Sequence, residues 1–328
     1  MHSCRVLVTR KIPGSGLFRL QEFCEVTILN EPPSYKELLN MVPGYNGLLT
    51  MLSDKITSEI IDAAGPDLRI ISNYAVGFDN IDVEYATENS IIVAHTPDVL
   101  TDSTADLAWA LLMATARRLI EGDQLTRTEK WKAWSPTFML GLDVHHKTLG
   151  IVGLGRIGLA VAKRALAFDM KVLYFSRTRK YEIESKFGIE YRTLDDLLRE
   201  SDFISLHVPL TPETEGMIGA KQLQMMKSTA ILINTARGRV VDEDALIHAL
   251  KESQIRGAGL DVYREEPTHN RELLKLPNVV LTPHLGSATI ETRIKMADLA
   301  INNLINGLTH QYDRVKIVNP SVLKKLKK

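Results

Sequence analysis

The chain has 328 residues, of which 45% are hydrophobic and 24% are charged, a balance typical of globular proteins that excludes a disordered or fibrous one. Its 40 lysines and arginines balance 40 aspartates and glutamates, so no bulk charge attracts nucleic acid or an anionic membrane. We therefore expect a small-molecule partner, and the length predicts two domains.

Cysteines and targeting segments give little signal. Cys4 and Cys24 are the only cysteines, too few for a disulfide framework and without metal-ligand spacing, which favours a reducing compartment. The first residues, MHSCRVLVTRK, enter a strand-like VLV without an apolar signal core, and no stretch approaches the roughly 20 apolar residues of a membrane span. We expect a cytoplasmic protein without a membrane partner.

The first hundred residues alternate short β-branched runs with helical patterns. In chain order these are CRVLVTR, GLFRLQEF, CEVTILN, YKELLNMV, YNGLLTML, TSEIIDAA and LRIISNY. Strands that alternate with helices predict a parallel sheet.

The pattern changes around Asp98, where LTDSTADLAWALLMATARRLIEG predicts one long helix. Asp102 or Ser103 is placed to cap its start, and Gly122 stands near its end. We expect this helix to open a second domain. Its apolar stretch from 107 to 119 also suggests a dimer interface.

A second alternation of strands and helices begins at Thr148 with TLGIVGLG and continues through KVLYF, DFISLHVPL, TAILINTA, GAGLDVY and NVVLTPH. It predicts a doubly wound sheet with right-handed crossovers. After Ser287, ATIETRIKMADLAINNLINGL reads as one helix, and we expect the last twenty residues to fold back on the first domain.

The predicted architecture is a Rossmann-type domain over residues 99–288, inserted into a smaller flavodoxin-like α/β domain formed by 1–98 and 289–328. The chain would cross between the domains near 98 and near 288. A cleft between two such domains would suit a small ligand, and closure could exclude water.

A dinucleotide fingerprint follows the strand TLGIV. Gly153 would permit a tight turn, Gly155 would let backbone approach a pyrophosphate, and Gly158 would let the next helix pack on the strand. The predicted phosphate loop comprises Gly153, Leu154, Gly155, Arg156, Ile157 and Gly158.

The carboxylate that usually grips the ribose should stand at the end of KVLYF, about 20 residues after the first glycines. Ser176, Arg177 and Thr178 occupy this place. An arginine and two hydroxyls can bind a 2′-phosphate that a carboxylate would repel, so NADP is favoured and NAD remains possible. Alternatively, Arg177 and Arg179 are solvent-exposed loop residues that do not contact the cofactor.

Three polar residues follow strands of the inner domain, at the edge where ligands bind in open α/β sheets. They are Arg237 in NTARG, Glu266 in GLDVYREEP and His284 in TPHLGSAT. A histidine beside a carboxylate is a competent proton donor, and an arginine can hold a substrate carboxylate and polarise the adjacent carbonyl. Together they predict reduction of a 2-oxo acid.

The motifs GLGRIG, NTARG, GLDVYREEP and TPHLGSAT, in this order and on these strands, resemble the D-isomer-specific 2-hydroxyacid dehydrogenase family. Within it, SNYAVGFDNID, FSRT and TPHLGSAT are most similar to the glyoxylate/hydroxypyruvate reductase branch. The resemblance covers nearly the whole chain.

The resemblance implies that Arg237 orients the substrate, that His284 donates the proton and that Glu266 is its partner, whereas Glu265 is a solvated acid. The implied substrate contacts are Leu52, Val76, Gly77, Arg237 and His284. Val76 and Gly77 would present backbone N–H groups to the substrate carboxylate.

Further cofactor contacts are also implied, with Asp261 near the nicotinamide carboxamide: Thr104, His207, Val208, Pro209, Thr235, Ala236, Asp261 and Gly286. His145 and His146 are interpreted as surface residues, and no cluster has metal-ligand spacing, so no metal is expected. Trp134 either packs in its loop, like Trp131, or reaches the active site of a partner subunit as in relatives.

The resulting hypothesis is an NADP-preferring reductase of glyoxylate, hydroxypyruvate or both, giving glycolate or D-glycerate and acting as a homodimer. The resemblance also argues against formate oxidation, because formate-oxidising relatives have a glutamine beside the histidine where this sequence has Glu266. One alternative is a dehydrogenase of the 3-phosphoglycerate or D-lactate type. Another is a non-enzymatic corepressor of similar fold that senses dinucleotides.

Overall fold

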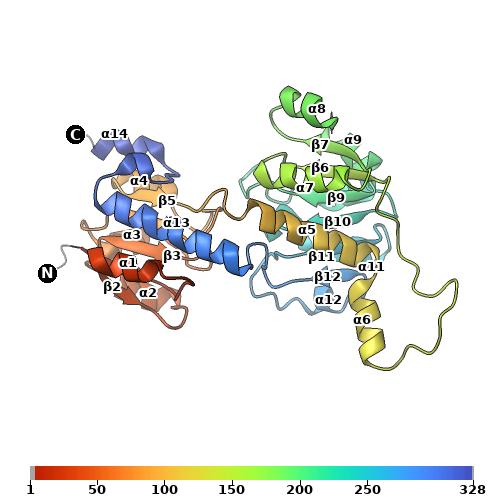
Figure 1. The fold of residues 1–328 in the computed structure, drawn as a ribbon, viewed down its shortest axis with the longest axis horizontal. Helices are drawn as coiled ribbons and strands as arrows, with labels where there is room; N and C mark the ends of the chain where they lie inside the picture. Colours follow the sequence, from red (N-terminus) through yellow and green to blue (C-terminus); the bar gives the residue numbers. More distant parts are fainter. Residues whose placement is uncertain (1–3, 327–328) are drawn as a thin grey trace. The chain divides into compact units, whose positions relative to one another are not determined.

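The computed structural model describes residues 4–326 of the chain (Figure 1). The chain folds into two compact units. The first contains the residues up to Leu100 and those from Ala288 onwards, and the second contains Thr101–Ser287. Each unit is built on its own parallel sheet.

The first unit has a five-stranded sheet in the order β2-β1-β3-β4-β5, with every pair parallel. This is the flavodoxin-like strand order, so the predicted fold of the smaller domain is confirmed. The strands are β1 (Arg5–Val8), β2 (Glu25–Ile28), β3 (Gly47–Thr50), β4 (Ile70–Asn73) and β5 (Ile92–Ala94). The helices are α1 (Gly16–Phe23), α2 (Tyr35–Met41), α3 (Ser58–Ala64), α4 (Val83–Glu88), α13 (Ile290–Leu308) and α14 (Leu323–Leu326).

Both faces of this sheet are covered, which explains the continuously apolar strands. Ile71 belongs to the core cluster that includes Ile60 of α3, whereas the hydroxyl of the next residue, Ser72, donates to the Ala300 carbonyl of α13 at 2.9 Å. Successive strand residues point to opposite faces, so α2, α3 and α4 cover one face and α13 covers the other.

The segment after α13 returns to the edge strand β5, as predicted. Val318 N–H donates to the Val93 carbonyl at 2.8 Å, and the Asn319 side chain accepts from Val93 N–H and donates to the Ile91 carbonyl, both at 2.9 Å. Asn319 is buried, so it satisfies backbone groups at the sheet edge that would otherwise lack partners.

Cys4 and Cys24 form a disulfide, with their Cα atoms 5.1 Å apart. The parallel register of β1 and β2 pairs Arg5 with Glu25, so the residues just before them lie side by side. The expectation of a reducing compartment rested on unpaired cysteines, so the disulfide removes its basis. The number of cysteines did not reveal this pairing, because it depends on the strand register.

The second unit has a seven-stranded parallel sheet in the order β12-β11-β10-β9-β6-β7-β8. Counted from β6, this is the Rossmann order 3-2-1-4-5-6 with one additional strand, so the predicted doubly wound fold is confirmed. The strands are β6 (Thr148–Val152), β7 (Lys171–Phe175), β8 (Glu190–Tyr191), β9 (Phe203–Leu206), β10 (Ile231–Asn234), β11 (Gly257–Leu260) and β12 (Val279–Leu281). The helices are α5 (Thr101–Ala116), α6 (Leu119–Arg127), α7 (Arg156–Leu166), α8 (Tyr181–Phe187), α9 (Leu194–Glu200), α10 (Ala220–Met225), α11 (Glu243–Lys251) and α12 (Arg271–Leu274).

The long helix predicted from residue 100 to 122 is instead two helices, α5 and α6. Arg118 stands between them with a left-handed φ of 53°, which ends the helical repeat, and its guanidinium binds Glu121. Gly122 therefore lies inside α6, and Asp102 and Ser103 lie in the first turn of α5 instead of capping it. The apolar side of α5 packs on β10, β11 and α7 of its own unit.

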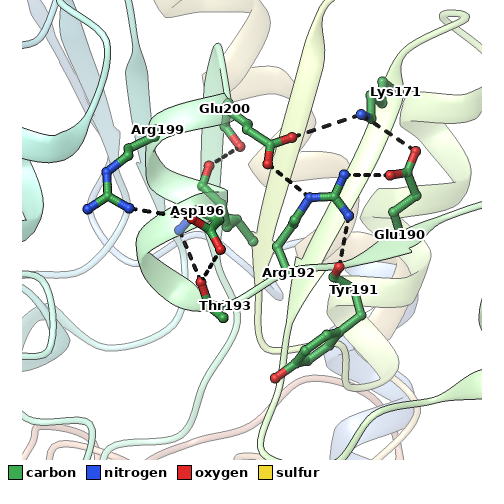
Figure 2. A network of polar contacts seen from close by, with 10 residues as sticks. Lys171, Glu190, Tyr191, Arg192, Thr193, Asp196, Arg199 and Glu200 are labelled. Atoms are coloured by element: carbon green, nitrogen blue, oxygen red, sulfur yellow. Dashed lines mark hydrogen bonds and ion pairs between the residues drawn. The ribbon is translucent and has the colours of Figure 1, made fainter.

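Sequence analysis missed β8, which has only two residues and no periodicity. Ion pairs hold this edge strand (Figure 2): the Arg192 guanidinium binds Glu190 of β8 at 2.6 Å and Glu200 of α9 at 2.9 Å. Lys171 of β7 adds a 3.5 Å ion pair with Glu190. The network surrounds a strand edge that is otherwise short and exposed.

Candidate active site

The phosphate loop follows β6 and leads into α7. Gly153 has a φ of 99°, and a Cβ there would lie 2.7 Å from the carbonyl of His207. A Cβ on Gly158 would collide with the Gly153 carbonyl, so two of the three glycines are required by packing. Nothing lies within 4 Å of a Cβ built on Gly155, which precedes the first turn of α7. This open space beside a helix N-terminus fits a pyrophosphate.

The side chains between these glycines differ in exposure. Leu154 is buried in the core of the unit, so only its backbone can face a ligand. Arg156 is exposed and Ile157 is partly buried at the start of α7. The loop therefore offers mainly backbone groups to a phosphate.

The residues expected to grip the ribose form a turn after β7. The Ser176 hydroxyl donates to the Thr178 carbonyl at 2.7 Å, so its only hydrogen takes part in a hydrogen bond within the turn. Arg177 is exposed, and its charge reaches Glu213, whose pKa is lowered mainly by a hydrogen bond from Thr211 and in part by Arg177. Arg177 and Thr178 are both exposed in this turn.

Arg179 is different from Arg177, although both lie in the same loop. Its Nε and Nη2 donate to the two carboxylate oxygens of Glu184 at 2.9 and 2.8 Å, and the guanidinium stacks over Tyr181. Hydrogen bonds from Arg179 and then from Tyr174 hold the pKa of Glu184 below its usual range. This neighbouring acid is therefore compensated within the protein.

Two groups expected at the cofactor wall have unusual surroundings. Burial lowers the pKa of His207 to about 4, and its Nε2 lies 2.8 Å from the Ser205 hydroxyl. His207 is therefore neutral at physiological pH. The Thr235 hydroxyl is buried and has no hydrogen-bond partner among the described residues.

The remaining residues expected at the cofactor lie on the same carboxyl edge of this sheet. Val208 contacts the Gly153 turn, and Pro209 follows it after β9. The Thr104 hydroxyl donates to the Gly286 carbonyl at 3.1 Å, which joins the first turn of α5 to the loop after β12. Ala236 N–H donates to the Asn234 side chain at 3.0 Å after β10.

His284 and Glu266 follow β12 and β11 and are paired. His284 Nδ1 lies 2.7 Å from Glu266 Oε2, and Tyr263 N–H donates to the other oxygen at 3.2 Å. An ionised carboxylate only accepts, so Nδ1 carries the hydrogen in this contact. Burial of Glu266 would raise its pKa, but the hydrogen bond and charge of His284, with smaller effects from Tyr263 and Arg237, lower it.

The turn that carries His284 is held by Asp261. His284 has a left-handed φ of 56°, a backbone conformation that residues other than glycine rarely adopt unless neighbouring groups hold them in it. Asp261 accepts from Leu285 N–H at 2.6 Å, from Gly286 N–H at 2.8 Å and from the Thr282 hydroxyl at 2.6 Å. Burial raises the pKa of Asp261 despite these hydrogen bonds. Asp261 therefore fixes the backbone around His284, a role that sequence analysis did not identify.

Arg237 follows β10 in the same unit. Its carbonyl accepts from the Asn234 side chain at 2.9 Å, and a Cβ on the next residue, Gly238, would collide with the backbone of Tyr263. The Arg237 loop is thus packed directly on the loop that leads to Glu266. The structure brings the three predicted catalytic residues to one edge of one sheet.

The predicted substrate residues of the first unit lie after β3 and β4. Leu52 follows β3, and Val76 and Gly77 follow β4. The buried Asn73 side chain donates to the Gly77 carbonyl at 2.9 Å, and Asn80 donates to the Met51 carbonyl at 3.0 Å. Sequence analysis missed both asparagines, although polar residues in the apolar surroundings of SNYAVGFDN were a usable signal.

Other residues that sequence analysis weighed lie outside these clusters. His145, His146 and Glu265 are exposed, and Glu266 also lies at the surface, with 37% of its side chain exposed. Across residues 4–326, no group of three metal-ligating side chains could hold a metal ion, and none of the described helices is both long and apolar enough to cross a membrane.

Comparison with known proteins identifies the family. The model of the D-isomer specific 2-hydroxyacid dehydrogenase NAD binding domain matches residues 109–286. The glyoxylate reductase of Thermococcus kodakarensis is 57% identical over 307 residues, which cover 92% of each chain.

Solved structures agree with this match. A Thermus thermophilus protein is 48% identical, with a TM-score of 0.88 over 93% of this chain and 97% of that one. The NADPH-dependent glyoxylate/hydroxypyruvate reductase of Sinorhizobium meliloti, solved with NADP and malonate, is 36% identical, with a TM-score of 0.83 over 93% and 94% of the two chains. The chain therefore belongs to the D-isomer-specific 2-hydroxyacid dehydrogenases, a family of enzymes.

Proposed function

We propose that this enzyme reduces glyoxylate to glycolate with NADPH, and that it also accepts hydroxypyruvate. The hydrogen-bonded pair of His284 and Glu266 carries the proposal, because reduction of a carbonyl needs a proton donor that is held in a fixed orientation. The close relation to the Thermococcus kodakarensis glyoxylate reductase supports glyoxylate as the substrate.

The bound dinucleotide would supply the hydride to C2 of the oxo acid. His284 would donate the proton from Nε2 to the carbonyl oxygen, while Glu266 stabilises the imidazolium through Nδ1. Arg237 would hold the substrate and stabilise the negative charge that develops on the oxygen. Val76 and Gly77 would bind the substrate carboxylate through backbone N–H groups.

The preference for NADPH rests on the turn after β7. Arg177 is exposed there without a carboxylate in the ribose position, and the nearby Glu184 is compensated by Arg179. The NADP-bound reductase of Sinorhizobium meliloti supports this choice. Because the net charge of the turn is not repulsive to a 2′-phosphate, we expect NADH to be the weaker cofactor.

The test is a steady-state measurement of kcat/KM for NADPH and NADH, each with glyoxylate, hydroxypyruvate, pyruvate and 3-phosphohydroxypyruvate. The proposal requires the highest value for NADPH with glyoxylate or hydroxypyruvate. A higher value with pyruvate or the phosphorylated substrate would favour the D-lactate or 3-phosphoglycerate type. No turnover with any oxo acid, together with NADPH binding, would favour a dinucleotide-sensing corepressor.

We further propose a homodimer that uses α6 and the loop after it. No residue of α6 is buried, and this segment exposes large apolar side chains: Leu119, Ile120, Trp131, Trp134, Phe138 and Leu140. Figure 1 shows α6 and this loop projecting away from the sheet of their own unit. Such an apolar surface is unusual on a monomer, whereas α5, expected from sequence to dimerise, already packs on its own sheet.

Light scattering should give a molar mass twice that of one chain. The double variant Leu119→Asp and Leu140→Asp should have the mass of a single chain. A monomeric wild-type protein would contradict the proposal. Trp134→Ala separates its two roles: lost turnover in an intact dimer supports a place in the partner subunit's active site, and unchanged turnover supports loop packing.

A further inference from the structure

The loop that joins β4 to α4 is held at three successive carbonyl groups. Thr96 N–H donates to the Ala75 carbonyl at 2.8 Å, His95 Nδ1 bonds the Val76 carbonyl at 2.9 Å, and Asn73 Nδ2 donates to the Gly77 carbonyl at 2.9 Å. Each donor comes from a different backbone or side-chain group of the first unit. Three consecutive peptide planes are therefore fixed in orientation.

Fixing a carbonyl also fixes an N–H group, because the two point in opposite directions in a planar trans peptide. The His95 ring holds the carbonyl of the peptide that joins Val76 to Gly77, so it aims the Gly77 N–H away from the ring. Among residues 4–326, no acceptor takes a hydrogen bond from the N–H of Val76 or Gly77. These partly buried donors are suited to an anionic ligand.

We propose that His95 is a positioning residue for the substrate, which acts by holding the Val76–Gly77 peptide so that its N–H meets the substrate carboxylate. This inference rests on the proposed function, because that function assigns a carboxylate to Val76 and Gly77. A carbonyl only accepts hydrogen bonds, so His95 carries a hydrogen on Nδ1 in this arrangement. The ring also packs edge-on against Phe78, with centroids 6.0 Å apart.

His95 is itself anchored by the last long helix and the segment that follows it. Its N–H donates to the Lys316 carbonyl at 3.1 Å, and its carbonyl accepts from Asn303 Nδ2 at 2.9 Å. Asn303 is fully buried in α13 and accepts from Lys316 N–H at 2.9 Å. The imidazole therefore stands on a rigid base, which a positioning group requires.

His95 is a better probe of this loop than Asn73. Asn73 is fully buried and also bonds the Thr50 hydroxyl and the Asn80 side chain, so its replacement would damage the core. His95 is only partly buried, and the bond to Val76 is made by the end of its side chain. A change at His95 can thus alter the loop while the sheet is preserved.

The experiment compares His95→Asn, His95→Gln and His95→Ala in the full-length enzyme. An asparagine amide nitrogen can occupy the place of Nδ1, whereas the longer glutamine puts its nitrogen near Nε2, so the two amides differ mainly in donor position. We expect the Gln and Ala variants to raise the KM for glyoxylate roughly three- to tenfold, with kcat changed less than about twofold. The Asn variant should stay close to the wild type.

The affinity for oxalate, a carboxylate that cannot be reduced, is measured by calorimetry on the NADPH-saturated proteins. It should fall in the Gln and Ala variants and be retained in the Asn variant, while NADPH affinity and the midpoint of thermal unfolding stay unchanged. This readout does not need turnover. Failure of the proposed function would appear as a wild-type enzyme that reduces no oxo acid, whatever the order of the oxalate affinities.

Two results would overturn the role of His95. One is oxalate affinity and glyoxylate KM equal to wild type in both the Gln and Ala variants. The other is an Asn variant as impaired as the Ala variant, which would show that the ring packs against Phe78 without positioning the peptide. If the Ala variant does not fold, the comparison of Asn with Gln decides alone.

Discussion

The two sheets of this enzyme present different kinds of groups at the carboxyl ends of their strands. The seven-stranded sheet presents ionisable side chains: Arg237, Glu266 and His284 follow β10, β11 and β12. The five-stranded sheet presents backbone after β4, whose carbonyls are held by His95 and Asn73. A side chain that does chemistry must be a particular residue type, whereas a backbone donor can belong to almost any residue. The second kind of site is therefore defined by its supports.

The largest effect should follow from removal of the proton donor. His284→Gln should reduce kcat by about 10²- to 10⁴-fold, because the proposed general acid is lost, while the affinity for NADPH stays unchanged. Steady-state kinetics and fluorescence titration with NADPH check the two parts. His269→Gln, which changes an exposed histidine of the same unit, is the matched control. Near-normal turnover in the His284 variant would remove this residue from the mechanism.

Removal of its carboxylate partner should have the next largest effect. Glu266→Gln should reduce kcat roughly 10- to 100-fold, because the negative charge of the hydrogen-bond partner of His284 is lost. Glu265→Gln, at an exposed neighbouring acid, should change kcat less than about twofold. Equal losses in the two variants would show that local charge, and not the 2.7 Å contact, matters.

The pH dependence of the pair has a definite sign. The pKa of Glu266 lies below its usual value of 4.5, so the carboxylate stays ionised above that pH and the pair's stabilisation is lost as the pH falls through the lowered value. Glu266 should therefore not limit kcat/KM between pH 5 and 8. A rate loss centred in that range which disappears in Glu266→Gln would contradict this assignment.

Cofactor choice should change by a smaller factor. Arg177→Ala should raise the KM for NADPH about tenfold and leave that for NADH unchanged, because only NADPH carries the 2′-phosphate. Arg179→Ala is the matched control: this arginine is engaged by Glu184, so its loss should affect both cofactors alike. An equal effect of Arg177→Ala on both cofactors would mean that Arg177 is only a loop charge.

The same contrast explains what the sequence could reveal. Strand and helix alternation predicted both sheets, and the glycines and the proposed catalytic side chains were recognisable because their chemistry demands those residue types. The break at Arg118, the two-residue strand β8 and the Cys4–Cys24 disulfide left no periodic signal.

The supporting contacts were hidden for a related reason. Asp261 fixes the His284 turn through three hydrogen bonds, and the Ser176 hydroxyl donates a hydrogen bond to the Thr178 carbonyl. Each depends on where backbone groups come to lie after folding. Residue type alone could not distinguish these supports from groups that contact a ligand.

The smallest expected effect is on stability, and it concerns the difference between two histidines of the second unit. His284 has a carboxylate partner, whereas burial lowers the pKa of His207 to about 4, from an ordinary 6.5 in the unfolded chain. Between these values the unfolded state binds the additional proton, so stability decreases as the pH falls from 6.5 toward 4. His207 should account for a loss of about 1 kcal/mol in the free energy of unfolding between pH 7.5 and 5.8.

Urea unfolding of the cofactor-free enzyme and of His207→Gln at both pH values isolates this contribution. Glutamine can keep a nitrogen near the Ser205 hydroxyl but does not titrate, so the pH-dependent difference between the two proteins should belong to His207. Cofactor-free protein is required because bound dinucleotide would add its own pH dependence. If both proteins lose the same stability, His207 is not buried in its neutral form, and its expected place as an uncharged wall beside the cofactor would have to be abandoned.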